Sequence, residues 1–136
     1  MRIVLDASAA LAAVVGRSPA AGVLDVLASA SIVLAPDLFA SEIADGLWKY
    51  VSAGELTGDQ ASTALDAALD LVERLVPTSS LAQEALREAT HYRNAVYDLC
   101  YAIAARREGC AVLTLDRRLQ TLLKKMGIPV AAIKKP

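Results

Sequence analysis

The sequence predicts a single α/β domain, in which a parallel sheet carries helices on both faces. Short runs of aliphatic and β-branched residues alternate with helical segments along the whole chain, and this alternation is typical of a parallel sheet. The length of 136 residues suits one domain, and no linker, repeat or low-complexity stretch divides it, so residues 1–136 are expected to form one unit. In such folds, ligands bind beyond the carboxyl ends of the strands.

The chain opens with a strand and two helices. Arg2–Leu5 is a short β-rich run and predicts the first strand. Ala7–Val15 has a helical composition and stops at a glycine. A second helix is expected to about residue 30, with Ser18 as its N-cap and Pro19 as its first helical residue.

A buried strand and two longer helices follow. The run Ser31–Ala35 is apolar and closed by a proline, which predicts a strand. A helix is expected from about Asp37 to Ser52. Thr57 and Gln60 have the spacing of a capping box, and they predict a long helix that reaches about Arg74.

The next unit pairs a weak strand with a helix. Leu75–Thr78 is a strand candidate, and Pro77 within it indicates an edge position because proline cannot donate to a ladder. Ser80 and Gln83 again have capping-box spacing, which predicts a helix from there to about Tyr92.

The last third contains the clearest apolar pattern. Tyr97–Glu108 is a largely apolar helix that ends at a glycine. Cys110–Leu115 predicts a buried strand, and Asp116–Met126 the last full helix. Gly127–Ile133 is expected to add a short final strand.

The composition excludes several classes of protein. Hydrophobic residues make up 55% of the chain, which excludes intrinsic disorder. The longest run without a charge, Val26–Pro36, has 11 residues, whereas a membrane-spanning helix needs about 20. Asp6 interrupts the apolar N-terminus and argues against a signal peptide, so a cytoplasmic location is expected. Cys100 and Cys110 have no metal or redox spacing and are expected to be buried, reduced thiols.

Charge is distributed unevenly along the chain. Residues 106–136 contain eight basic and two acidic residues, a net charge of +6, while residues 1–105 contain six basic and thirteen acidic residues, a net charge of −7. Such asymmetry fits a basic edge that faces a polyanion, and it equally fits solvated helix ends.

Four acidic residues stand in unusual positions. Asp6 and Asp116 each follow directly on an apolar strand, at the end where a ligand site is expected. Asp98 is the only charge between Arg93 and Arg106, inside an apolar helix. A buried carboxylate without a partner is costly, so Asp98 requires a partner or a metal. Glu42 lies one turn into its helix.

Each of these acids also has a structural interpretation. Asp6 and Asp116 have the right position to cap the helices that follow them. Asp98 has the right position to act as a capping residue in the first turn of its own helix. Glu42 shares a helix face with Asp45 and Lys49, where it would simply pair with Lys49 or water.

The four acids together favour a hard cation. Carboxylates without a nearby histidine or cysteine suit Mg²⁺ or Mn²⁺ and not zinc. Clustered acids of this kind support two-metal hydrolysis of phosphodiesters. The other catalytic templates are absent, because the single histidine, His91, has no nucleophile signature beside it and the glycines form no phosphate-binding loop.

Four motifs resemble those of the PIN-domain family. They occur in the family's order over nearly the whole chain, and are Val4–Ser8 (VLDAS), Ser41–Lys49 (SEIADGLWK), Tyr97–Tyr101 (YDLCY) and Thr114–Leu119 (TLDRRL). One motif alone is weak, whereas four in order are specific. Asp45 departs from the family, which often has asparagine there, and it would bind metal indirectly or pair with Lys49.

The resemblance implies a three-layer α/β/α fold with a small parallel sheet of about four to five strands. It implies that Asp6, Glu42, Asp98 and Asp116 are the metal-site acids of an endoribonuclease that uses Mg²⁺ or Mn²⁺, with Ser8 and Thr114 as supporting hydroxyls. The small single-domain form is similar to VapC toxins of toxin–antitoxin pairs. That similarity implies a small VapB-like antitoxin that blocks the site, and a homodimer.

Three alternatives remain at this point. A housekeeping PIN ribonuclease of RNA maturation or decay would have the same site, and a non-catalytic PIN scaffold would have the fold without the activity. A signalling receiver domain fits poorly, because Asp6 is followed by Ala7 and the predicted strand Leu75–Thr78 ends without an acid.

Overall fold

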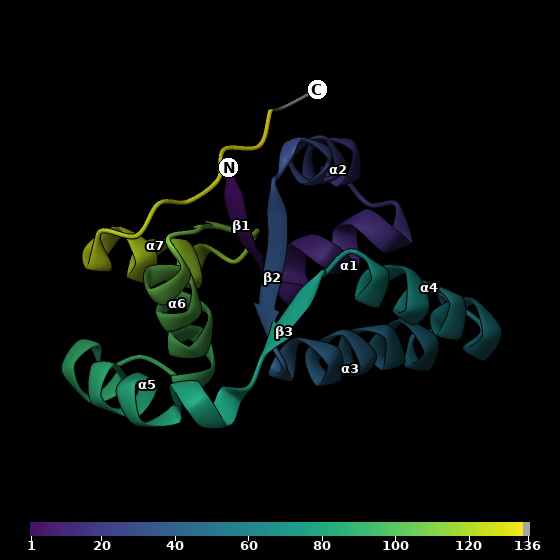
Figure 1. Cartoon of the computed structure of the whole chain (residues 1–136). Coiled ribbons are helices and arrows are strands. Elements are labelled where there is room, and N and C mark those ends of the chain that lie inside the picture. The colour runs from purple at the N-terminus through teal and green to yellow at the C-terminus, as the bar shows by residue number, and fades with distance from the viewer. Residues whose placement is uncertain (135–136) are drawn as a thin grey trace.

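The computed structural model describes residues 1–134 and contains a parallel sheet at its centre (Figure 1). Its strands are β1 (Arg2–Leu5), β2 (Ile32–Pro36), β3 (Arg74–Val76) and β4 (Ala111–Leu113). They are all parallel, in the order β3-β2-β1-β4, so β3 lies at an edge as Pro77 predicts. The expected sheet of about four to five strands is confirmed, with four.

Helices cover both faces of this sheet (Figure 1). One layer contains α1 (Ala7–Val15), α2 (Ala20–Ser29), α3 (Leu38–Ser52) and α4 (Gly58–Asp70). The other contains α5 (Thr78–Tyr92), α6 (Val96–Glu108) and α7 (Arg117–Met126). The predicted three-layer α/β/α architecture is therefore confirmed.

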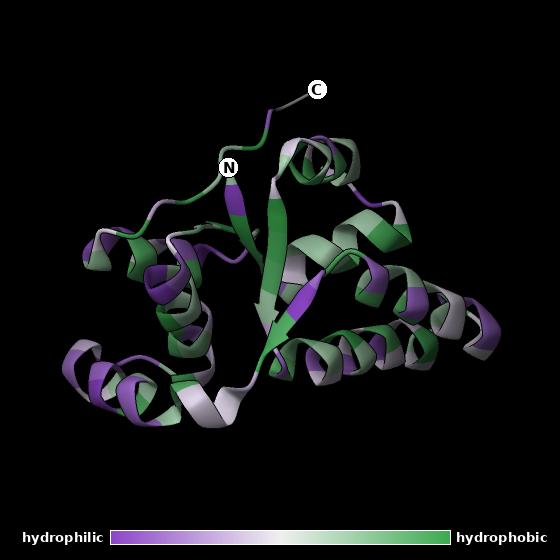
Figure 2. Ribbon diagram, in the orientation of Figure 1, coloured by the Kyte–Doolittle hydropathy of each residue, from purple (hydrophilic) through white to green (hydrophobic). Residues whose placement is uncertain are grey.

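The apolar strands separate two hydrophobic cores. Side chains alternate along a strand, so Ile3 and Leu5 of β1 pack with the α1–α4 layer while Val4 packs with the α5–α7 layer. Figure 2 shows the central strand β2 in green, between helices that also carry purple hydrophilic residues. Helix α6 is buried from Asp98 to Ala105, which explains why its sequence is apolar on every side. Cys100 and Cys110 are buried and reduced, as predicted.

None of the single helices within residues 1–134 has the length and apolar character needed to cross a membrane. Helices α1 and α2 would meet that test together, but a bend of 114° separates them, and both contribute side chains to the core on one face of the sheet.

The predicted start of the second helix is wrong by one residue. Helix α2 begins at Ala20, and Pro19 is its N-cap in place of Ser18. The ψ angle of Pro19 is 56°, outside the helical region, so Pro19 cannot be the first helical residue.

The helix that starts at Thr57 is shorter than predicted. The capping box of Thr57 and Gln60 is present, with both of its hydrogen bonds. The helix ends at Asp70, however, and Arg74 is already the first residue of β3. The backbone N–H of Glu73 donates to the carbonyl of Val33 on β2. The chain therefore joins the edge of the sheet at this point, and the helix does not continue.

The second predicted capping box does not form. Helix α5 begins at Thr78, two residues before Ser80, and the Ser80 hydroxyl donates to the carbonyl of Pro77. The carboxylate of Asp37 accepts the backbone N–H of Thr78 at 2.9 Å. A side chain 41 residues away in sequence thus satisfies the first turn of this helix.

The predicted final strand Gly127–Ile133 is wrong. Val130 forms only an isolated bridge with Val112, although Val112 exchanges backbone hydrogen bonds with Pro129 and Ala131. Strand β4 is also shorter than its predicted range, because the chain leaves the ladder after Leu113.

The ladder brings Asp6 close to Thr114, the residue that follows β4. The backbone N–H of Asp6 donates to the carbonyl of Leu113 at 3.0 Å, so the residues that follow β1 and β4 leave the sheet side by side. Asp6 and Thr114 therefore start the candidate site.

Candidate functional site

Asp6 is the buried centre of the site. Its side-chain oxygen Oδ2 accepts the hydroxyl of Ser8 at 2.6 Å and the hydroxyl of Thr114 at 2.7 Å. Asp6 has the N-cap position of α1, but its carboxylate makes no capping hydrogen bond. The capping interpretation of Asp6 is therefore wrong, and two hydroxyls from different segments orient it instead.

Asp116 lies next to this cluster and does cap a helix. Its Oδ1 accepts the backbone N–H of Arg118 at 2.8 Å and that of Leu119 at 3.3 Å, at the start of α7. Its own backbone N–H donates to the hydroxyl oxygen of Thr114. Thr114 thus connects Asp6 with Asp116 by hydrogen bonds.

Glu42 reaches the site from α3. Its Oε1 accepts the hydroxyl of Tyr101 at 2.6 Å, across the sheet end from α6. The alternative pairing of Glu42 with Lys49 does not occur; Lys49 pairs with Asp45 at 3.4 Å, and both side chains are largely exposed. Tyr101 is fully buried, so its hydroxyl holds Glu42 in one orientation.

Asp98 completes the set from the first turn of α6. Its Oδ2 accepts the side-chain amide of Asn94 at 2.8 Å and the Nε–H of Arg118 at 3.1 Å. The Arg118 side chain is 68% exposed and that of Asp98 only 12%. The sequence did not predict the partners of Asp98 and Glu42, which are Asn94 and Arg118 for the first and Tyr101 for the second. Only the i, i+4 spacing of Asn94 and Asp98 indicates one of these pairs.

The charges of the four acids influence one another. Burial raises the pKa of Asp6 above its ordinary value, the Ser8 and Thr114 hydroxyls oppose this rise, and the charge of Asp116 adds to it. Burial also raises the pKa of Glu42, against the Tyr101 hydrogen bond, and the charges of the other three acids raise it further. The structure therefore brings all four predicted acids into one electrostatic neighbourhood.

The donor set fits a hard divalent cation. Among residues 1–134, the hydrogen bonds to Glu42, Asp98 and Asp116 each fall on one carboxylate oxygen only, and the two hydroxyl donors of Asp6 share its Oδ2. Oxygen ligands of this kind are the ones that Mg²⁺ and Mn²⁺ prefer. Within the same residues, no group of three or more acidic, histidine or cysteine side chains is already drawn together around a metal position.

Comparisons with known proteins identify the family of this chain. The sequence model of the PIN domain family matches residues 3–125. Ribonuclease VapC3 of Pyrobaculum aerophilum is 32% identical over 121 residues, which cover 88% of this chain and 92% of that protein. Ribonuclease VapC1 of Mycobacterium tuberculosis is 34% identical over 116 residues, which cover 85% of this chain and 86% of that protein.

Two solved structures share the fold. The crystal structure of PAE2754 from Pyrobaculum aerophilum superposes with a TM-score of 0.69 at 26% identity, over 90% of this chain and 87% of that one. VapBC2 from Rickettsia felis, crystallised with a DNA fragment from its promoter, contains a chain that superposes with a TM-score of 0.69 at 16% identity, over 98% and 100%. This second likeness concerns the fold alone.

Proposed function

Because the chain belongs to the PIN-domain family, with VapC ribonucleases among its relatives, we propose that it is an endoribonuclease that depends on Mg²⁺ or Mn²⁺. The observation that carries this proposal is the group of four neighbouring carboxylates, from the segments after β1 and β4 and from helices α3 and α6, each oriented by hydrogen bonds from other residues. The names of the sequence relatives supply the substrate class, RNA.

Asp6, Glu42, Asp98 and Asp116 would hold the cation, directly or through water. When bound, it supplies a positive charge for the phosphate oxygens and lowers the pKa of a coordinated water. Ser8 and Thr114 fix the orientation of Asp6, and Tyr101 that of Glu42. Since Tyr101 occupies Oε1, Oε2 of Glu42 remains available to accept a hydrogen bond from the attacking water.

The biological role we propose is that of the toxin in a toxin–antitoxin pair, acting on RNA in the cytoplasm. Similarity to the VapC ribonucleases supports this role, and the fold shared with a chain of the VapBC2 complex agrees with it. A small VapB-like antitoxin and a homodimer belong to the same proposal. A neighbouring reading frame for a small protein that inhibits cleavage would support the toxin role over a housekeeping ribonuclease.

Incubation of the purified protein with mixed tRNA and rRNA tests the activity. Discrete fragments are expected with Mg²⁺ or Mn²⁺, and none with EDTA or with Asp98→Asn, because EDTA removes the cation and Asp98→Asn removes one of the carboxylates proposed to hold it. The matched control is Asp45→Asn, which deletes an exposed carboxylate on α3 that pairs with Lys49. Absence of both cleavage and metal binding in the unaltered protein would contradict the proposal and favour a non-catalytic scaffold.

Tyr101→Phe is expected to lower cleavage about tenfold, because Glu42 loses the donor that orients it. The free energy of unfolding should fall by about 1 kcal/mol, the net value of one hydrogen bond. The hydrogen bond lowers the pKa of Glu42, so its loss should also shift the acidic limb of the pH–rate profile to higher pH.

Measured rates against pH would check this prediction, with Tyr92→Phe as the control. Tyr92 is only partly buried, and no hydrogen bond to its hydroxyl occurs within residues 1–134. An unchanged pH–rate profile in Tyr101→Phe would show that Tyr101 does not act through Glu42.

A further inference from the structure

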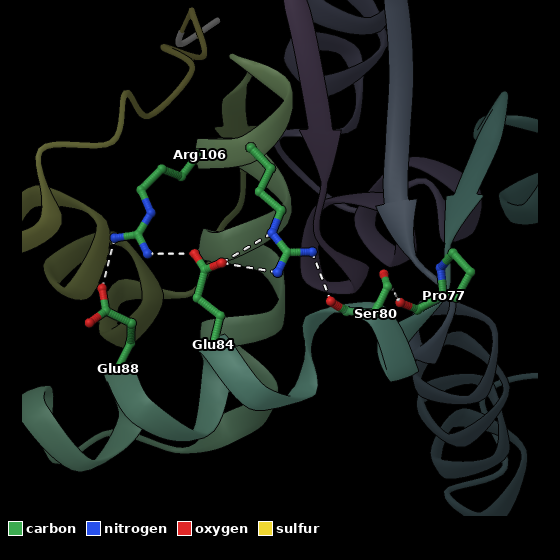
Figure 3. A network of polar contacts seen from close by, with 6 residues as sticks. Pro77, Ser80, Glu84, Glu88 and Arg106 are labelled. Carbon is green, nitrogen blue, oxygen red and sulfur yellow. Dashed lines mark hydrogen bonds and ion pairs between the residues drawn. The ribbon is translucent and has the colours of Figure 1, made fainter.

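Two of the basic residues near the C-terminus hold helices together. Arg106 on α6 binds Glu84 at 2.6 Å and Glu88 at 2.7 Å on α5, and Arg107 binds Glu84 at 3.0 Å (Figure 3). Arg107 also donates to the carbonyl of Ser80. These contacts neutralise two of the eight basic side chains counted in residues 106–136, and Lys135 lies outside the described residues.

Arg117 and Lys124 on helix α7, unlike Arg106 and Arg107, face a groove. Arg117, Gln120, Thr121 and Lys124 follow one another at the spacing of a single helix face, and they line one wall of a groove of about 1180 Å³. The segment Gly127–Ile133, which leads away from α7 in yellow in Figure 1, forms the other wall. No acidic residue lines this groove, and no carboxylate within residues 1–134 makes an ion pair with Arg117 or Lys124. The groove therefore carries two uncompensated positive charges.

The groove adjoins the acidic site. Thr114, whose hydroxyl binds Asp6, is also part of the groove wall. Gln120 in the groove donates its side-chain amide to the carbonyl of Thr114 at 3.0 Å. A polyanion seated along α7 would thus reach the four carboxylates at one end of the groove.

We propose that this groove binds the backbone of single-stranded RNA next to the cleaved bond. The inference rests on the proposed ribonuclease function and specifies where its substrate lies. Arg117 and Lys124 are two turns apart, about 10.5 Å along the helix, so they can follow the phosphates of one strand. Gln120 and Thr121 add polar contacts, and Val130 and Ile133 offer apolar surface to the sugars and bases.

A single strand suits this groove better than a duplex. The cations lie on one helix and face one wall, so they provide a single row of charge. A duplex displays two phosphate rows, whereas single-strand binders combine one charged groove with surface for the bases. Duplex RNA of the same sequence is therefore expected to bind more weakly.

The test is fluorescence anisotropy of a labelled single-stranded RNA on protein that carries Asp6→Asn, which prevents cleavage. Adding Arg117→Gln with Lys124→Gln is expected to weaken binding about tenfold or more and to lower the slope of log affinity against log salt by about 1.4, the value for two phosphate contacts on a single strand. The matched control adds Arg87→Gln with Lys125→Gln, which removes the same charge outside the groove and is expected to leave affinity and slope nearly unchanged.

Several outcomes would overturn the inference. Equal weakening in the two double variants would show a non-specific charge effect, and equal binding of duplex RNA would contradict the single-strand assignment. A groove variant that binds RNA normally but changes oligomeric state in sedimentation would assign the groove to a second copy of the chain. If the groove variant binds normally and the unaltered protein cleaves RNA, only the groove inference fails; if the unaltered protein neither binds nor cleaves RNA, the proposed function fails as well.

Discussion

Asp6→Asn is expected to reduce RNA cleavage by more than about a hundredfold while it raises thermal stability at neutral pH. Asn keeps the shape of Asp6 and can still bond with the Ser8 and Thr114 hydroxyls, but it removes the charge that attracts a cation. Even residues that only support metal ligands commonly contribute 10- to 100-fold, so a ligand itself should contribute more. Cleavage rates with Mn²⁺ and thermal melting curves would measure the two effects.

The opposite change in stability follows from the pKa of Asp6. Burial, and then the charge of Asp116, raises this pKa above its unfolded value of 3.8. The folded protein therefore binds more protons than the unfolded chain once the pH exceeds that value, and stability falls as the pH rises through the folded pKa. Asn has no proton to lose, so the metal-free variant should lack this part of the pH dependence and melt at a higher temperature at pH 7.5.

Asp45→Asn is the matched control for Asp6→Asn. It removes the same charge from an exposed site, where Asp45 pairs with Lys49, and surface pairs contribute little. Its cleavage rate and melting temperature should stay close to those of the unaltered protein. Normal cleavage by Asp6→Asn would contradict the assignment of the acidic cluster as the reactive site.

Mn²⁺ is expected to raise the melting temperature by about 10 °C at pH 7.5. An ion that binds only the folded protein stabilises it by about 2.7 kcal/mol when its free concentration is a hundred times its dissociation constant. For a domain between 100 and 150 residues, each kcal/mol corresponds to roughly 4 °C. The shift should shrink as the pH falls, because protons compete for Asp6 and Glu42, whose pKa values are raised.

Differential scanning fluorimetry with and without EDTA would measure this stabilisation. In Asp6→Asn and Asp98→Asn the shift should be strongly reduced, whereas Asp45→Asn should retain it. An equal shift in all three variants would mean that Mn²⁺ binds elsewhere on the protein.

Two sequence patterns with the spacing of a capping box show where prediction from sequence succeeds and where it fails. Thr57 with Gln60 forms the predicted capping box, because both partners lie within four residues of each other and nothing else competes for them. Ser80 with Gln83 has the same spacing, yet the helix starts two residues earlier. The carboxylate of Asp37, from the segment after β2, satisfies Thr78 instead, and a contact between distant segments cannot be seen in a local pattern.

For the acids of the candidate site, likewise, the sequence predicts some features and leaves others to the tertiary structure. Apolar runs that stop at an acid predicted Asp6 and Asp116 at strand ends. Asp6 directly follows β1, whereas β4 ends at Leu113 and Asp116 lies three residues later, as the N-cap of α7. Parallel strands bring these two segments together. Asp98 was recognisable because a lone charge in an apolar helix needs a partner. The identity of that partner was not recognisable, since Arg118 lies on another helix.

Local sequence was thus enough to predict the α/β class and most of the helices and strands, because hydrophobic periodicity is a property of short segments, and it singled out four acids as candidates for one site. Tertiary packing decided how the charged and polar side chains are paired. It placed Tyr101 on Glu42, directed Arg106 to α5, and left Arg117 and Lys124 facing a groove beside the acids. Such pairings depend on distances between segments that are remote in sequence, and those distances exist only once the sheet has brought the helices together.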